Sequence, residues 1–188
     1  MPDWVLAAER AYVAAAVSHT PAASVAPTAE PTALDHRRAV AAAGAIASRF
    51  LAVGTPRSFG IVIDDQVDDG ALGLAAHRAW FQPRDIRCAG ARAAELAAAT
   101  GGRVVSLDEA LACDIVNVHA AITLAPAQLR RGTHVNLVAN VALAPDLVAT
   151  IVHEAGLPAL AAGLVDGRQL DELTIFVVDG APIARAAR

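Results

Sequence analysis

Lysine is missing from this chain of 188 residues, and all 15 of its basic residues are arginine. Without lysine, no side chain of the protein can form a Schiff base or supply a catalytic ammonium group. No GxSxG motif occurs, and Ser24 and Thr28 lie in a proline-rich segment without a base, so nucleophilic hydrolysis also lacks support. Cys88 and Cys113 are isolated thiols without CxxC spacing, and we expect both to be buried and reduced.

Metal-ligand patterns are also missing. The histidines are scattered, and no pair has the spacing of zinc ligands. His119 follows an apolar segment, but a catalytic imidazole needs a carboxylate or nucleophile beside it, and residues 120–122 offer none. His134 lies inside another apolar segment, where we expect it to satisfy a backbone group. The sequence therefore predicts no catalytic residue and no metal ligand.

Little in the composition points to a nucleic-acid or lipid surface. The formal net charge is −4 and no basic cluster occurs, which argues against a nucleic-acid or anionic-membrane partner. No apolar run is as long as a membrane span, and Asp3, Glu9 and Arg10 stand where a secretory signal has a basic region followed by an apolar stretch. We therefore expect a cytoplasmic protein. With 55% hydrophobic residues, the chain can bury one substantial core.

The chain divides into a short N-terminal piece and one larger domain. Residues 3–17 have the apolar periodicity of a helix, and prolines among Ala, Ser and Thr then mark a linker. A second helix is predicted for 35–51. We expect an N-terminal helix and proline-rich linker over residues 1–34, and a Rossmann-like domain over residues 35–188.

From Ser58 onward, strand-like and helical patterns alternate. Short connections between them imply right-handed crossovers and a parallel sheet. The predicted strands are 58–63, 85–89, 103–105, 114–118, 133–138 and 173–178, and the predicted helices are 71–81, 91–99, 107–112 and 145–155. The predicted fold class is α/β, Rossmann-like, with a mainly parallel sheet and helices on both faces.

An acidic run occupies the turn between the first strand and its helix, where a dinucleotide-binding protein has glycines. The run DDQVDD spans residues 64–69, and Gly70 and Gly73 are displaced toward the helix. Glycines let the backbone approach a pyrophosphate at the helix N-terminus, whereas carboxylates there interact with the helix dipole themselves and repel a phosphate. We expect Asp68 or Asp69 to cap the helix, and no cofactor to bind. The alternative is a solvated turn in a protein without a nucleotide-binding ancestor.

The acidic run suggests two other roles. Carboxylate oxygens are the usual ligands of hard cations, but the run lacks the loop pattern of a calcium site. It can instead contact an arginine or lysine surface on another protein. The predicted partner-binding residues are therefore Asp64, Asp65, Asp68 and Asp69.

Six short segments, in order along the chain, carry a resemblance to a known family. They are AERAY at 8–12, AAAGAIASRFL at 41–51, SLDEA at 106–110, CDIV at 113–116, RGTHVN at 131–136 and DELTIF at 171–176. Together they resemble the ornithine cyclodeaminase and mu-crystallin family, and the resemblance covers most of the chain. It implies a Rossmann core descended from an NAD(P)-dependent enzyme.

The chain departs from this family at the places that serve substrate binding, cofactor binding and catalysis. The proline linker stands where family enzymes build their substrate and dimerisation domain, so the chain resembles a truncated relative. Residues 88–90, Cys-Ala-Gly, stand where a charged side chain meets the adenosine ribose. Residues 138–142 lack the catalytic aspartate that the family carries beyond this strand. No functional residue of the enzymes therefore carries over.

Two functions follow from the resemblance. The first is a non-enzymatic scaffold that binds a peptide or a partner subunit, like the peptide-binding members in bacterial ribosomal-peptide (crocagin-type) biosynthesis, which bind a precursor peptide and guide its modification. The peptide adds to an open sheet edge or lies in the groove left by the missing domain, and we expect a homodimer or a heterodimer with a paralogue. The alternative is an NAD(P)-dependent cyclodeaminase or dehydrogenase-like subunit that completes its site across an oligomer.

Overall fold

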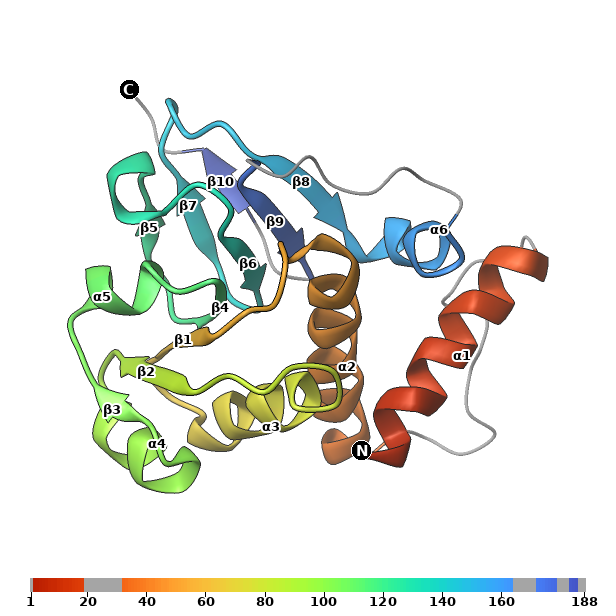
Figure 1. Cartoon of the computed structure of the whole chain (residues 1–188), viewed down its shortest axis with the longest axis horizontal. Coiled ribbons are helices and arrows are strands. Elements are labelled where there is room, and N and C mark those ends of the chain that lie inside the picture. The colour runs from red at the N-terminus through yellow and green to blue at the C-terminus, as the bar shows by residue number, and fades with distance from the viewer. Residues whose placement is uncertain (1, 19–31, 164–171, 179–182, 186–188) are drawn as a thin grey trace.

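The computed structural model describes residues 2–18, 32–163, 172–178 and 183–185 (Figure 1). The helices are α1 Asp3–Ser18, α2 Ala33–Leu51, α3 Val67–His77, α4 Ala93–Thr100, α5 Leu107–Leu111 and α6 Leu157–Ala161, with short 3-10 turns at Pro126–Gln128 and Glu154–Gly156. The strands are β1 Ser58–Ile63, β2 Asp85–Ala89, β3 Arg103–Val104, β4 Ile115–His119, β5 Thr123–Leu124, β6 His134–Leu137, β7 Val141–Leu143, β8 Thr150–His153, β9 Thr174–Val177 and β10 Ile183–Arg185.

Seven strands form the central sheet in the order β3-β2-β1-β4-β6-β9-β8, and each described pairing in it is parallel. All six residues of β1 are buried, which explains its continuous run of apolar and small side chains. The strand order reverses between β1 and β4, as in doubly wound dinucleotide-binding folds. The α/β, Rossmann-like fold predicted from the sequence is therefore confirmed.

Different elements cover the two faces of the sheet. On one face, α3 and α4 pack on β1 and β2 around Phe59, Ile61 and Leu96. On that same face, α2 packs on β6 and β9, beside α3 (Figure 1). The other face carries α5 and a small parallel sheet of β10, β7 and β5, with Val141 and Leu143 in its core. This arrangement leaves α2 and α3 together over the middle of the sheet.

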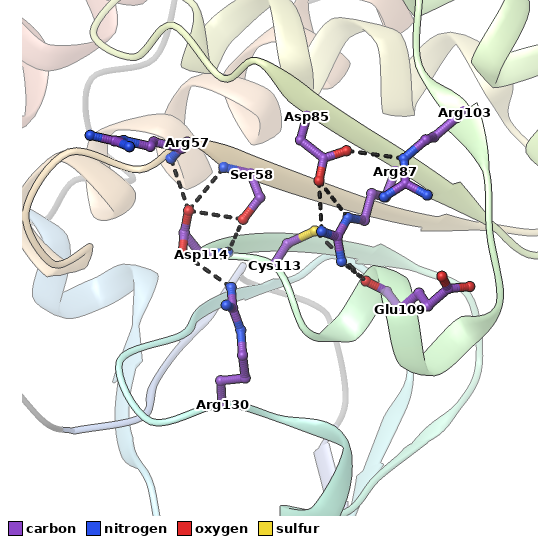
Figure 2. Close-up of polar contacts among 9 residues, drawn as sticks. All are labelled: Arg57, Ser58, Asp85, Arg87, Arg103, Glu109, Cys113, Asp114 and Arg130. Carbon is purple, nitrogen blue, oxygen red and sulfur yellow. Dashed lines mark hydrogen bonds and ion pairs between the residues drawn. The ribbon is translucent and has the colours of Figure 1, made fainter.

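Polar side chains hold the amino ends of β1, β2 and β4 in place (Figure 2). The Oδ2 atom of Asp114 accepts hydrogen bonds from the backbone amides of Arg57 at 2.8 Å and Ser58 at 2.9 Å, and from the Ser58 hydroxyl at 2.8 Å. Asp85 similarly accepts from Arg87 at 2.8 Å. These contacts satisfy the polar groups at this edge of the sheet, opposite the edge where Rossmann folds bind ligands.

The two cysteines are free and buried, as predicted. Burial raises the pKa of the Cys113 thiol to about 11, so it stays protonated near neutral pH. Cys113 lies beside the polar contacts of the amino edge (Figure 2). Neither thiol therefore has the environment of a reactive nucleophile.

Several local predictions are wrong. Residues 150–153 of the predicted helix 145–155 form β8, because they pair with β9 in the central sheet. The small sheet of β5, β7 and β10 was not predicted, since its strands are only two or three residues long. Helix α3 begins earlier than expected, and its N-cap is Gln66, which makes no side-chain capping bond. Asp68 and Asp69 therefore lie inside the first helical turn rather than at the cap.

Helix α1 packs against α2 and α6. Val5 is fully buried, and the Tyr12 hydroxyl donates to Glu154 Oε1 at 2.5 Å. Most of the predicted proline-rich linker, residues 19–31, lies outside the described residues. The division into 1–34 and 35–188 remains a prediction.

Candidate functional site

A cavity of about 350 Å³ opens at the carboxyl ends of β4, β6 and β9, beneath α2 and α3. This is the edge of the sheet, next to the reversal of strand order, where open α/β folds place their ligands. Its polar lining consists of His36, Arg37, Asp69, Asn117, His119 and Asn136. Its apolar lining includes Val40 of α2 and Val138 after β6.

Buried polar side chains form a connected network behind the cavity. Asn136 of β6 donates from Nδ2 to Asn117 Oδ1 on β4 at 2.9 Å, and to Ser48 Oγ on α2 at 3.0 Å. Its Oδ1 lies 3.1 Å from His134 Nε2, and His134 Nδ1 lies 2.8 Å from the Thr174 hydroxyl on β9. Each of these residues is less than 4% exposed. The network thus joins three neighbouring strands to α2 inside the core.

His77, at the end of α3, closes the network on the helix side. It is fully buried, with Nδ1 2.8 Å from the Gly73 carbonyl and Nε2 2.8 Å from Ser48 Oγ. A carbonyl oxygen only accepts, so the Nδ1 atom carries the proton and Nε2 accepts. Burial lowers the pKa of His77 to about 4. The ring is therefore neutral near pH 7.

Two polar atoms in the cavity wall have no hydrogen-bond partner among the described residues. The first is His119 Nε2, which is shielded from solvent. The amide nitrogen of Asn117 makes none of the hydrogen bonds of the network, which engages that side chain through Oδ1 alone. A Cβ atom on Gly73 would lie 2.7 Å from Asn117 Nδ2 and 3.9 Å from His119 Nε2. A larger residue at position 73 would therefore crowd Asn117 Nδ2 and contact His119 Nε2, whereas glycine leaves room beside both atoms.

His119 has the electrostatic properties of a neutral ring. Burial lowers its pKa to about 4, although the nearby charge of Asp69 acts in the opposite direction. Sequence neighbours offered it no partner, but the fold places it in the cavity wall with Asp69 and Asn117. Among the described residues, no carboxylate or nucleophile is hydrogen-bonded to its Nε2 atom, as the orientation of a general base would require.

The four predicted partner-binding aspartates have different environments. Asp69 pairs with Arg37 of α2 at the cavity wall. Asp64 accepts a hydrogen bond from the backbone amide of Ala91 at 3.0 Å. Asp65 is exposed, and the Asp68 side chain is 88% exposed. Their role in binding a partner remains a prediction.

The residues at the β1–α3 turn do not fit a dinucleotide. Asp64 bridges to the turn after β2, between the places where a pyrophosphate and an adenosine ribose bind in Rossmann folds. Asp68 and Asp69 put two carboxylates into the first turn of α3, where the helix dipole attracts a phosphate. Gly70 has a packing role, because a Cβ there would lie 3.2 Å from side-chain atoms of Ile61, Ile63 and Leu96.

Sequence reasoning missed most of the residues around the cavity. The predicted strands contain Asn117 and Asn136 but give neither a role, although an amide inside a buried apolar strand needs a hydrogen-bonding partner and is a usable signal. His77 has no partner nearby in the sequence that would indicate its place in the network. Both ring nitrogens of His134 pair with side chains, where a backbone group was expected. These contacts join residues up to 88 positions apart, beyond the reach of local patterns.

Among the described residues, no group of three His, Cys, Asp or Glu side chains is arranged to hold a metal ion. Within the same part of the chain, no helix is both long and apolar enough to cross a membrane.

No protein-family model matches the sequence. A search of curated proteins also finds no match. The fold, however, is similar to several solved structures. An archaeal alanine dehydrogenase dimer with bound NAD superimposes with a TM-score of 0.61 and 21% identity, covering 78% of this chain and 59% of the dehydrogenase. The iminosuccinate reductase of Paracoccus denitrificans, in complex with NAD+, gives 0.60 and 21%, covering 76% and 57%.

A probable ornithine cyclodeaminase from Bordetella pertussis Tohama I gives a TM-score of 0.57 and 19% identity, covering 78% of this chain and 61% of that protein. The chain thus spans a little under two thirds of the length of these structures. The likeness agrees with the cyclodeaminase resemblance seen in the sequence. At these identities it establishes a shared fold.

Proposed function

We propose that this chain is a non-enzymatic binding scaffold that holds a peptide on a Rossmann core. More specifically, the chain is a truncated cyclodeaminase-like protein of the bacterial cytoplasm. It binds the precursor of a ribosomal peptide and guides the modification of that peptide. It works as a homodimer or as a heterodimer with a paralogue. The observation that carries the proposal is the contrast between the β1–α3 turn, engaged by the chain's own side chains, and the open cavity beside it.

The turn supports the loss of dinucleotide chemistry. A pyrophosphate here would lie against the carboxylates of Asp68 and Asp69 and would compete with Asp64 for the Ala91 amide. The phosphate charges and these carboxylates repel each other, although solvent screens the exposed Asp68 and Arg37 offsets part of the charge of Asp69. Within the described part of the chain, the cavity retains His119 Nε2 without a hydrogen-bond partner, and the amide nitrogen of Asn117 is left over by a bond that engages only its Oδ1. A neutral ligand can therefore enter where a nucleotide is disfavoured.

The second candidate is an NAD(P)-dependent cyclodeaminase or reductase subunit that completes its site across an oligomer. The comparisons favour it over the peptide role, because the similar structures are enzymes and two of them hold NAD. The residues of the β1–α3 turn favour the scaffold. Whether this chain binds a dinucleotide therefore decides between the two candidates.

The deciding experiment is calorimetry and thermal unfolding with NAD+, NADH, NADP+ and NADPH. A ligand at one hundred times its Kd stabilises the native state by about 2.7 kcal/mol, so binding in the micromolar range raises the Tm at millimolar dinucleotide. We expect no heat of binding and no change in Tm. Micromolar affinity for any of the four would contradict the loss of dinucleotide binding and favour the second candidate.

A positive test of the scaffold uses peptides encoded by short reading frames beside this gene. We expect one of them, labelled with fluorescein, to bind with a saturable change in anisotropy. A scrambled peptide of the same composition serves as the control. Equal binding of the native and scrambled peptides would contradict a precursor-specific scaffold.

A further inference from the structure

The hydrogen-bond network behind the cavity has a fixed direction. His77 Nε2 must accept, because Nδ1 donates to the Gly73 carbonyl. The Asn136 amide group lies 3.3 Å from this nitrogen, so its NH₂ group, and not its oxygen, faces His77. The same NH₂ group then donates to Asn117 Oδ1. His77 thereby determines which way both asparagine amides point.

This direction leaves a hydrogen-bond donor at the cavity. With its oxygen held by Asn136, Asn117 presents Nδ2 on the other side, toward Gly73. Asn117 is only 3% exposed, so its unused donor is held in place by a side chain that is otherwise enclosed in the core. A donor in this position needs an acceptor from water or from a ligand.

The second unpartnered atom lies close by. His119 Nε2 and Asn117 Nδ2 both lie within 4 Å of the same point, the place of a Cβ on Gly73. A neutral imidazole nitrogen either accepts or donates, according to its tautomer. The pair therefore complements a ligand group that carries an acceptor and a donor side by side.

We infer that the cavity binds a neutral carboxamide, whose oxygen accepts from Asn117 Nδ2 and whose N–H donates to His119 Nε2. The apolar wall around Val40, Val138 and Val178 packs against the carbon atoms that carry the amide. The inference rests on the proposed function for its natural ligand, which is the side chain of an Asn or Gln in the bound peptide. It gives the peptide a defined anchor at the carboxyl edge of the sheet.

Charged groups fit the cavity less well. A carboxylate needs a cation once it leaves water, but Arg37 is already paired with Asp69. His119 does not supply the charge, since its ring is neutral at pH 7. An ammonium group has only hydrogen-bond donors. It therefore cannot accept a hydrogen bond from Asn117 Nδ2, the group of Asn117 that is free. A neutral amide avoids these penalties and uses both free atoms.

The test compares isobutyramide with isobutyrate, two probes of the same shape that differ in charge. Each is titrated into the 15N-labelled protein, and the side-chain amide signals of Asn117 and the ring signals of His119 are followed by NMR. We expect isobutyramide to shift both sets of signals saturably at millimolar concentration. We expect isobutyrate to bind at least fivefold more weakly. Equal or tighter binding of isobutyrate, or shifts confined to other residues, would overturn the inference.

Two variants locate the amide in the cavity. His119→Phe removes both nitrogens and keeps a ring, and we expect it to weaken isobutyramide about fivefold, as the loss of one hydrogen bond predicts. The matched control is His153→Phe on the exposed strand β8, with unchanged affinity. Val138→Phe fills the cavity from the segment after β6 without replacing a polar residue, and should abolish binding even if the first variant folds poorly. Unchanged affinity in Val138→Phe would place the probe elsewhere.

The outcomes separate this inference from the proposed function. If a peptide binds while isobutyramide leaves Asn117 and His119 unaffected, the scaffold stands and the carboxamide site is wrong. If isobutyramide binds in the cavity and the native peptide binds no better than its scrambled control, the site stands and the peptide scaffold is wrong. Replacing each Asn and Gln of a binding peptide by Glu or Asp then tests the anchor directly.

Discussion

Asn136 Nδ2 donates to Asn117 Oδ1 over 2.9 Å, and the two residues are register partners on the adjacent parallel strands β6 and β4. Parallel strands in this position normally carry apolar side chains on both faces. Here two buried amides complete each other and extend the network to α2, α3 and β9. The polar atoms of the cavity wall are therefore positioned from inside the core.

Asn136→Ala should destabilise the protein by about 3 kcal/mol. The change leaves Asn117 Oδ1 and one nitrogen of His134 without this partner, and an unsatisfied buried polar group costs about 1–3 kcal/mol. Urea unfolding at pH 7 measures the loss. Asn140→Ala, at an exposed position, is the matched control and should stay within about 0.5 kcal/mol of the wild type. A loss below 1 kcal/mol for Asn136→Ala would contradict a satisfied network.

Gly60→Ala should prevent normal packing of β1 on α5, which contains Ala110. A Cβ at this position would lie 2.1 Å from the carbonyl oxygen of Ala110, a backbone atom that cannot turn away. We expect a loss of more than 3 kcal/mol or failure to fold, measured by thermal unfolding and circular dichroism. Gly156→Ala is the control, since its Cβ would meet only Val152 at 3.8 Å. Similar Tm values for the two variants would show that β1 can shift.

Stability should fall as the pH falls from about 6.5 toward 4. His77 has a pKa of about 4 in the folded protein and its ordinary value of 6.5 when unfolded, so between these values only the unfolded chain takes up the proton. The stabilisation is complete above pH 6.5 and is lost toward pH 4, by about 3 kcal/mol for this group. His119, whose pKa is lowered in the same way, adds to the slope.

Urea unfolding at pH 7 and pH 4.5 measures this dependence. His77→Gln removes the titrating ring and should reduce the difference between the two pH values. His153→Gln, at an exposed site, should leave the difference as in the wild type. If the His77 and His153 variants have the same pH dependence as the wild type, His77 is not the source of the acid sensitivity.

Asp114→Ala should cost about 2–3 kcal/mol at pH 7. Burial raises the pKa of this carboxyl, but hydrogen bonds from Ser58 and Arg57 outweigh burial and hold the pKa below its usual range. The carboxylate therefore stabilises the folded state, and its loss leaves the Ser58 amide and hydroxyl without this acceptor. Asp146→Ala, an exposed aspartate, is the control for chemical denaturation. Equal stability of both variants would remove Asp114 as a determinant of the β1–β4 edge.

The acidic run should bind basic peptides weakly, in a salt-dependent way. Asp65 and Asp68 are exposed, whereas Asp69 is engaged by Arg37. We expect the double variant Asp65→Asn/Asp68→Asn to reduce the affinity for a penta-arginine probe severalfold at low salt, and added NaCl to reduce wild-type affinity similarly. Fluorescence anisotropy measures both, with Asp146→Asn as the control. If the complex still forms with the double variant and does not weaken as NaCl is added, the acidic run is not the binding site for a basic partner.

Local patterns were sufficient for the main strands. The segment 58–63 was predicted as a buried strand and is β1 without a change of bounds, because six consecutive apolar or small residues suit a strand buried on both faces. The predicted strand 133–138 became β6, shortened at both ends. The helix predicted for 145–155 failed because pairing with β9 outweighed its local helical pattern.

The candidate site was less accessible to sequence reasoning. The aspartate run was recognised because it breaks a local motif that needs glycine. Its pairing with Arg37, 32 residues away, was not foreseen. The orientation of the Asn117 amide depends on His77, Ser48 and Asn136 together, and no local pattern contains that relationship.

Apolar periodicity and the steric need for glycine act over a few neighbouring residues, so the Rossmann-like fold and the absence of glycines at the β1–α3 turn follow from local patterns in the chain. Which polar groups remain free depends instead on how distant elements pack together. A side chain is satisfied or unsatisfied by atoms that distant elements bring to it, and burial makes that difference energetically important. The unpartnered atoms of Asn117 and His119, and the cavity they face, exist only once α2 and α3 pack over β4 and β6.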